Sequence, residues 1–473
     1  MVATFIYRLN LAHLKIGGIM KRARFCSLSV HLSIAAVLTL FTTGSFAKGF
    51  NYNGVNVQLG GFLASETVYR DNNMASDVAT NFSKIPFKNS AQYGEPEFRG
   101  SERQSRFSLL AQGLYNHRVR VSGYYELDFL GAATTANSNE SNSYNPRTRV
   151  VYLDIDWLNS GWHLLAGQDW SLVTLNSDGI TPRHEVLPPT IDAQYAVGFN
   201  WARQWQTRIV KNWGKKYWAA LSLENPQTTA GGSAPTGYGA VYQFGPGSLF
   251  SNKTSMNSMP DIIVKFAWQP SFAHFEVYNL TRNFESEYGL IGSETRKQST
   301  WTDAAGAGVI VPFLHKKVKI KLSGLVGDGI GRYGTAQLPD VTYASDGRLE
   351  PLSGEQYLAQ LSWHARADLT SYITYGLESV NSSAGSGYGY GNSAVTTNAG
   401  CSNLGGTCSA EAKSVNQINL GFWWQIYKMQ KFGVLNFGAQ YSHTSLDTFA
   451  DATGISPSTS ENMVFTSLRY YPF

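Results

Sequence analysis

The sequence is poor in cysteine and has no long apolar run after residue 47. Cysteine occurs only three times in 473 residues. Cys401 and Cys408 are a candidate disulfide, because they lie close together in a Gly-, Ser- and Asn-rich stretch of an exported chain. Metal binding is the alternative, although two thiols without accompanying ligands make a poor zinc site. After Ala47 no stretch is apolar and long enough to cross a bilayer as a helix.

The first 47 residues have the pattern of a leader. From Met20 a basic segment precedes a mostly apolar stretch over 27–41, and Ser-Phe-Ala ends at Ala47. This pattern predicts a secretory signal peptide with cleavage after Ala47. The predicted domains are therefore a leader at 1–47 and a mature chain at 48–473. Either Met1 or Met20 can serve as the start.

A net charge is also absent once the leader is removed. The leader holds five of the 38 Lys and Arg residues and none of the 33 Asp and Glu residues, so 33 of each sign remain. The positive balance of the full chain thus gives no support to nucleic acid as a partner. In the mature chain the placement of charges carries more information than their sum.

The mature chain contains many segments in which polar and apolar residues alternate strictly. In "KVKIKLSG", for example, Lys317, Lys319 and Lys321 oppose Val318 and Ile320. Such alternation is typical of β-strands with one polar and one apolar face. We expect sixteen strands, at 55–70, 103–116, 117–130, 148–158, 161–171, 199–211, 214–225, 260–269, 272–281, 300–313, 317–327, 354–366, 369–380, 412–427, 432–446 and 461–473.

The connections between these strands are expected to alternate strictly between short and long. An even strand number with short turns at one end and long loops at the other is typical of outer-membrane barrels. The sequence therefore predicts an all-β, transmembrane antiparallel β-barrel of about 16 strands, with short periplasmic turns and long extracellular loops. Aromatic residues make up 13% of the chain, and we expect them in girdles at the membrane interfaces. Four tryptophans lie near predicted strand ends: Trp157, Trp162, Trp213 and Trp268.

The chain finishes on a β-rich segment with Tyr471 and Phe473. A terminal aromatic of this kind resembles the insertion signal that the barrel-assembly machinery recognises in outer-membrane proteins. Phe473 is out of phase with the apolar face of the last strand, so we expect a bulge around Tyr471 and Pro472.

Four short motifs, all in the first third of the mature chain, resemble the DcaP-like family of trimeric outer-membrane porins. They are "RQSRFSLLAQG" (103–113), "YYELDFLG" (124–131), "SYNPRTRVVYLDID" (143–156) and "LLAGQDWSLVT" (164–174). The resemblance implies a water-filled channel, a homotrimer and small anionic solutes, often dicarboxylate-like. Comparison with sixteen-stranded porins also implies that loop 172–198 folds inward and constricts the pore, with Arg183, His184 and Glu185 as candidates for its charged tip. The alternative is an ordinary exposed surface loop.

The polar strand faces can be examined independently of this resemblance. They are expected to face the lumen, where a ladder of cations would attract anions. The candidate pore-lining and substrate-binding residues are Arg106, Arg118, Arg120, Arg208, Lys317, Lys319 and Lys321, with Arg183 on the loop. The alternative is that Arg118 and Arg120 only pair with Glu126 or Asp128.

The predicted function is passive diffusion of small hydrophilic, anionic solutes through the bacterial outer membrane, with membrane lipid as the surrounding partner. A non-selective porin, a surface adhesion barrel and an outer-membrane hydrolase are the alternatives. We expect no enzyme, because no catalytic motif is present. No cofactor and no metal are implied.

Overall fold

The computed structural model describes residues 49–76, 78, 80–131, 144–192, 194–245, 253–429 and 432–473. The leader predicted at 1–47 lies outside the described residues. None of the helices in these ranges is long and apolar enough to cross a membrane.

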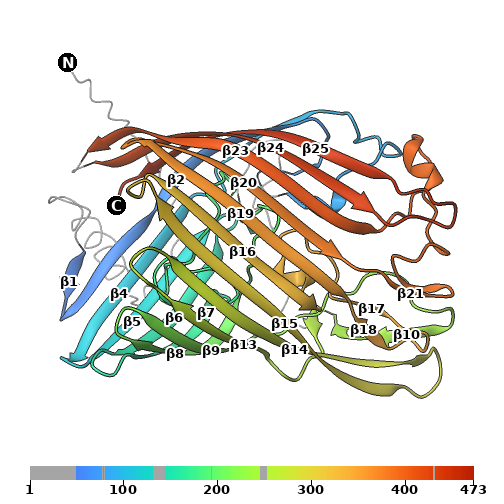
Figure 1. Cartoon of the computed structure of the whole chain (residues 1–473), viewed down its shortest axis with the longest axis horizontal. Coiled ribbons are helices and arrows are strands. Elements are labelled where there is room, and N and C mark those ends of the chain that lie inside the picture. The colour runs from blue at the N-terminus through green and yellow to red at the C-terminus, as the bar shows by residue number, and fades with distance from the viewer. Residues whose placement is uncertain are drawn as a thin grey trace, which may run out of the picture. The chain divides into compact units, whose positions relative to one another are not determined.

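Sixteen antiparallel strands close into a barrel, which confirms the predicted fold class (Figure 1). Closure occurs at the first barrel strand, β2, whose residues 55–62 pair with β4 and whose residues 63–70 pair with β25. The barrel strands are β2 (Val55–Arg70), β4 (Arg106–Asn116), β5 (Val119–Asp128), β6 (Arg147–Trp157), β7 (Trp162–Trp170), β8 (Arg203–Trp213), β9 (Tyr217–Glu224), β13 (Asp261–Trp268), β14 (His274–Leu290), β15 (Arg296–Phe313), β16 (Val318–Asp328), β19 (Ser353–Arg366), β20 (Leu369–Val380), β23 (Ala412–Met429), β24 (Gly433–Thr448) and β25 (Ser458–Tyr471).

The remaining short elements belong to the connections and to the amino-terminal end of the barrel. They are β1 (Phe50–Tyr52), β3 (Glu97–Ser101), β10 (Tyr238–Val241), β11 (Gln243–Phe244), β12 (Thr254–Ser255), β17 (Val341–Tyr343), β18 (Leu349–Pro351), β21 (Ser383–Gly385), β22 (Tyr388–Tyr390) and the 3₁₀ turns η1 (Phe82–Lys84), η2 (Gly331–Tyr333) and η3 (Ala399–Ser402). β1 folds back on the start of β2 as a hairpin.

The outer wall of the barrel is apolar and the inner wall is polar. Leu153 and Val277 point outward with 66% and 56% of their surfaces exposed, whereas the inward-facing Asp154 and Glu276 are buried. Exposed aliphatic side chains around a whole closed sheet would be costly in water and match a hydrocarbon environment. Trp157, Trp162, Trp213 and Trp268 are all exposed at the short-turn end of their strands, as expected for an interfacial girdle.

One connection departs from the predicted strict alternation of lengths. β14 runs to Leu290 and β15 begins at Arg296, so only residues 291–295 join them at the long-loop end. Their pairing extends from His274 opposite Ile310 to Tyr288 opposite Arg296. The distal part lies beyond the apolar band, where side chains on both faces can be polar. It therefore lacks the alternation on which the predicted bounds depended.

Candidate functional site

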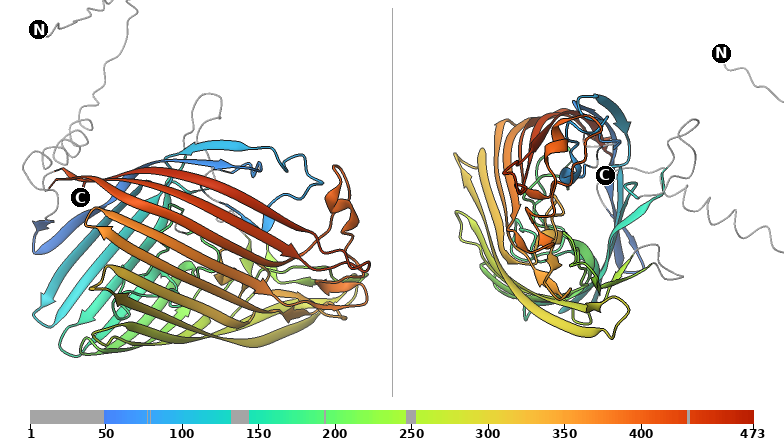
Figure 2. Two further views of the ribbon diagram at one scale, coloured as in Figure 1. Left: turned by 45° about the horizontal axis from the view of Figure 1, so that its top comes forward. Right: turned by 90° about the vertical axis from the view of Figure 1, so that its right-hand side faces the viewer.

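The connection between β7 and β8, residues 171–202, crosses the interior of the barrel; we call it the crossing segment. The backbone N–H of Asn176 donates to Glu276 on β14, at 3.1 Å. The N–H of Ile191 donates to Gln440 on β24 at 2.6 Å, and that of Gly198 donates to Glu378 on β20 at 2.7 Å. The segment is therefore fixed to widely separated parts of the wall. The view from the long-loop end shows chain inside the ring of strands (Figure 2).

The first half of the crossing segment forms a small hairpin. Asn176 and Glu185 make an antiparallel bridge. The N–H of Val186 donates to the carbonyl of Leu175 at 2.7 Å, and the N–H of Ser177 donates to that of His184 at 2.8 Å. Arg183 has a φ of 67° at the turn. These bonds place Glu185 on a braced strand of the hairpin.

Apolar clusters fill the space between the inward chain and the wall. Leu172, Val173 and Ile180 pack in one cluster with strand residues such as Val210 and Ile263. A second cluster joins the crossing segment to strands β2, β20, β23, β24 and β25. The part of the barrel that the inward chain occupies therefore has an apolar core of its own.

Gly198 marks the closest approach of the crossing segment to the wall. Its φ is +81°, and a Cβ placed there would lie 1.9 Å from the carbonyl oxygen of Tyr357 on β19. On β20, a Cβ at Gly376 would likewise meet the carbonyl oxygen of Val197 at 1.7 Å. Two glycines thus allow the backbones to lie against each other.

Replacing Gly198 with alanine is expected to displace the crossing segment, break its bond to Glu378 and raise single-channel conductance. Gly214→Ala is the matched control, because Gly214 also has a positive φ (+63°), but a Cβ added there would have no neighbouring atom within 4 Å. The control should cost only the ~1–2 kcal/mol of a left-handed alanine. Equal conductance and equal thermal stability in the two variants would contradict this account.

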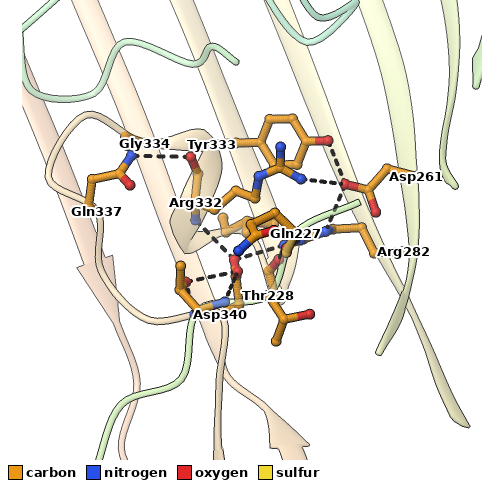
Figure 3. Close-up of polar contacts among 12 residues, drawn as sticks. Gln227, Thr228, Asp261, Arg282, Arg332, Tyr333, Gly334, Gln337 and Asp340 are labelled. Carbon is orange, nitrogen blue, oxygen red and sulfur yellow. Dashed lines mark hydrogen bonds and ion pairs between the residues drawn. The ribbon is translucent and has the colours of Figure 1, made fainter. Parts of the chain in front are cut away.

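A second inward segment, residues 329–340, is fixed by buried charges (Figure 3). Arg282 on β14 contacts Asp261 on β13 at 3.2 Å and Asp340 at 2.8 Å. All three side chains are at most 1% exposed. Asp340 also accepts a hydrogen bond from the N–H of Arg332, at 2.9 Å. Arg332 contacts Asp261 as well, at 3.3 Å, and the hydroxyl of Tyr333 donates to Asp261 at 2.8 Å, so a buried network around Asp261 and Arg282 joins the barrel wall to this segment.

Two further contacts lock the second inward segment to the crossing segment. The N–H of Trp201 donates to the carbonyl of Tyr333 at 2.9 Å. Glu378 accepts from Gly198 of one segment and from Thr335 and Ala336 of the other, at 2.7–2.9 Å. The two segments are thus one connected inner structure.

Three neighbouring cavities border the hairpin of the crossing segment. Their volumes are about 510 Å³, 130 Å³ and 560 Å³, and we call them the first, second and third cavity. Leu187 lines all three, and Glu185 lines the first and the second. The first cavity also reaches Pro270 and Ser271 in the turn between β13 and β14.

Arg106 and Arg183 are the predicted residues that line the second cavity. Arg106 also lines the third, and its buried Nε has no hydrogen-bond partner in the described chain. The nearest acid is Glu126, at 3.7 Å. Arg183 donates to the hydroxyl of Tyr152 at 2.5 Å. Both guanidiniums are therefore placed to meet a solute.

Lys319 and Lys321 line the first cavity together with Lys316, which sequence reasoning missed. Lys317 does not line it and lies in the exposed turn before β16. The three lysines of the cavity meet no acid within 4.0 Å in the described chain. The structure thus brings together two of the three predicted lysines.

The other predicted arginines do not line these cavities. Arg118 lies in the exposed turn before β5. Arg120 pairs with Asp156 at 2.6 Å, and Arg208 is buried against Asp169 at 2.5 Å. Arg120 and Arg208 are thus neutralised by acids, and Arg118 lies away from the cavities. The alternative that Arg120 only forms an ion pair is correct, but its partner is Asp156 and not Glu126 or Asp128.

Sequence reasoning missed Arg149 because of a β-bulge. The pairing of β5 with β6 shifts register so that Glu126 faces Val150 and Leu127 faces Thr148. Arg149 is the extra residue, and it turns inward to contact Glu126 at 2.7 Å and Asp128 at 2.6 Å. A bulge inverts the alternation on one side of it. Arg469, which lines the third cavity, does follow the alternation and was overlooked.

The remaining candidates lie at the two ends of the barrel. Cys401 and Cys408 are joined by a disulfide, and the N–H of Asn89 donates to the carbonyl of Cys401 at 3.1 Å. Pairing of β24 with β25 continues to Tyr471 without a register shift, so the bulge expected there is absent. The strand simply ends, and Phe473 follows it. The described residues contain no group of His, Cys, Asp and Glu that could hold a metal ion.

Comparison with solved structures identifies the fold. The outer-membrane channel DcaP of Acinetobacter baumannii matches 90% of this chain and 99% of its own, with 19% identity and a TM-score of 0.64. The fold is that of an outer-membrane channel. Together with the apolar outer wall, it places this barrel in the bacterial outer membrane.

Two further solved structures are similar at lower scores. An anion-selective porin from Comamonas acidovorans matches 88% of this chain and 99% of its own, with 11% identity and a TM-score of 0.49. OmpF of Salmonella typhi, solved with daunomycin, matches 89% and 99%, with 10% identity and a TM-score of 0.46. The sequence itself matches no protein-family model and no curated protein. The likeness is thus one of fold.

Proposed function

We propose that this protein is a channel for passive diffusion of small hydrophilic solutes, with a preference for anions such as carboxylates and dicarboxylates. The crossing segment is the constriction, because its hairpin borders all three cavities through Leu187. The transported solutes would pass beside this hairpin and meet the charged side chains around it.

The charge of the cavity walls is the observation that carries the anion preference. Among the described residues, six cationic side chains of Lys and Arg line the three cavities, against three carboxylates. The cations are Lys316, Lys319, Lys321, Arg106, Arg183 and Arg469, and the acids are Glu126, Asp169 and Glu185. Two of these acids are engaged by arginines that do not line a cavity, Glu126 by Arg149 and Asp169 by Arg208. One of the cations, Arg469, is likewise engaged by Glu66, so five cations remain against Glu185.

This arrangement favours anions by two physical effects. Uncompensated cations along a narrow aqueous wall raise the local potential, which concentrates anions and repels cations. A guanidinium also presents a planar set of donors that matches a carboxylate. Lys319 and Lys321 on one wall and Arg106 on the other provide separate points of attraction for a solute with two carboxylates.

The cellular setting forms part of the same proposal. The leader at 1–47 would direct export, and the terminal Tyr471 and Phe473 would be recognised by the barrel-assembly machinery. A homotrimer follows from the motif resemblance to the DcaP-like porins. The cations that line the cavities are explained by passage of anions, and they give no support to the alternative functions of hydrolysis or adhesion.

Liposome swelling tests the channel itself. We expect liposomes containing the purified protein to swell in small neutral solutes, and to swell roughly threefold faster in a dicarboxylate than in a diamine of equal length. Equal rates for the two ions would favour a general, non-selective porin. No swelling from heat-modifiable, folded barrels would contradict the channel.

A further inference from the structure

Glu185 of the crossing segment lies between two of the cavities. It lies on the braced hairpin and lines both the first cavity, with its lysines, and the second, with Arg106 and Arg183. Only Leu187 shares this position among the described residues. A charge on this carboxylate would therefore face solute on both sides of the hairpin.

No side-chain donor of the described residues is paired with Glu185. Its Oε1 is buried and has no hydrogen-bond partner, and the described residues offer it no ion pair within 4.0 Å. The ordinary arrangement for a buried carboxylate is a paired and hydrogen-bonded one. This acid is an exception that calls for a physical explanation.

The cations of the wall closest to Glu185 are occupied by other acids. Arg208 is 2.5 Å from Asp169. Lys265 is 2.5 Å from Glu276 and donates as well to Asn176, the bridge partner of Glu185, at 3.0 Å. Arg208 and Lys265 are therefore paired with Asp169 and Glu276, and neither forms an ion pair with Glu185.

The other charged groups around the hairpin do not compensate it either. His274 on β14 contacts Glu276 at 3.0 Å, and Arg183 on the hairpin contacts Tyr152. The other charged groups that line the two cavities come from the wall. They are Lys316, Lys319 and Lys321 from the β15–β16 side, Arg106 from β4 and Glu126 from β5. His184, next to Glu185 on the hairpin, is exposed.

We infer that Glu185 is a titratable selectivity group, neutral near neutral pH and ionised in alkaline solution, and that its ionisation weakens the anion preference of the channel. When Glu185 is protonated, the only other acids of the two cavities among the described residues, Glu126 and Asp169, are each paired with an arginine of the wall. When it ionises, a negative charge stands between the two cationic walls. This inference rests on the proposed channel function.

The direction of titration follows from the surroundings of the carboxyl group. Burial, with the neighbouring Asp169 as a second cause, raises the pKa of Glu185 to about 8. A group with a raised acid pKa stays neutral below that value and becomes charged as the pH rises through it. Anion preference should therefore be greatest below the pKa and fall above it.

Reversal potentials under a KCl gradient test this inference with the full mature protein in a planar bilayer. Between about pH 6 and about pH 9.5, the chloride-to-potassium permeability ratio should fall roughly threefold to tenfold in the unmodified channel, the order expected for one charge close to the ion path. Glu185→Gln should show a markedly smaller fall and keep its high ratio. Glu95→Gln, at an exposed position outside the barrel strands, is the matched control and should behave like the unmodified channel.

The outcomes separate the inference from the function on which it rests. The same pH dependence in the unmodified channel and in Glu185→Gln would overturn the role of Glu185, and so would a chloride preference independent of pH. A pH shift that Glu185→Gln removes supports the role even if the unmodified channel proves to prefer potassium, a result that would sink only the proposed anion preference. Heat modifiability in SDS shows that each variant has folded.

Discussion

Arg282→Met is expected to lower the free energy of unfolding by about 3–5 kcal/mol, the cost typical of removing one partner from a buried ion pair. The substitution would leave Asp340 buried without an ion-pair partner, and Asp261 with only the more distant Arg332, at 3.3 Å. It would also remove the ion pair between Asp340 and the wall and so loosen one end of the second inward segment, whose Thr335 and Ala336 remain bonded to Glu378. The urea midpoint of the folded barrel in detergent micelles measures the effect.

Two comparisons make this prediction specific. Arg366→Met removes an exposed ion pair, since Arg366 is 61% exposed beside Asp368, and should cost at most ~1 kcal/mol. Adding Asp261→Asn and Asp340→Asn to Arg282→Met should restore part of the stability, because no charge then remains buried alone. Similar midpoints for Arg282→Met and Arg366→Met would show that the buried network does not fix the inner structure.

Simultaneous replacement of Arg106, Lys319 and Lys321 by glutamine is expected to reduce the chloride-to-potassium permeability ratio by roughly tenfold. Lys319 and Lys321 meet no acid within 4.0 Å in the described chain, and Arg106, on the opposite wall, is 3.7 Å from Glu126, which Arg149 engages more closely. Glutamine keeps most of the side-chain volume and its polarity, so the pore should stay open and of similar conductance. The ratio is obtained from the shift of the zero-current potential in a salt gradient.

The matched control replaces Arg118 and Lys317 by glutamine. Both are cations of the same wall strands or their turns, but neither lines the three cavities. Their loss should change the ratio by less than about twofold, because exposed charges at the barrel mouth are screened by salt. An effect as large as that of the triple variant would mean that selectivity is set at the mouth.

The barrel could be predicted from the sequence because its two environments alternate along every strand. Lipid outside and polar groups inside impose a period of two, and the bounds predicted for 55–70 and 369–380 coincide with β2 and β20. The signal weakens where a strand leaves the apolar band, as it does in the distal parts of β14 and β15. There the sequence predicts a loop although the ladder continues.

The inner structure was far less accessible to sequence reasoning. The bulge at Arg149 changes which residues of β6 point into the barrel, and no pattern in the sequence predicts it. The segment at 329–340 has no periodicity, so its inward course depends on charges supplied by β13 and β14. Whether an inward arginine is engaged, like Arg208, or available, like Arg106, depends on partners brought close only by the fold.

The most direct test of the central claim is the reversal potential of single channels of the unmodified, mature protein in a planar bilayer, under a KCl gradient near neutral pH. If the cations around the crossing segment govern passage, the zero-current potential will have the sign of chloride preference, and added dicarboxylate will shorten the open events. A potential at zero, or one with the sign of potassium preference, in channels that conduct steadily would contradict that claim.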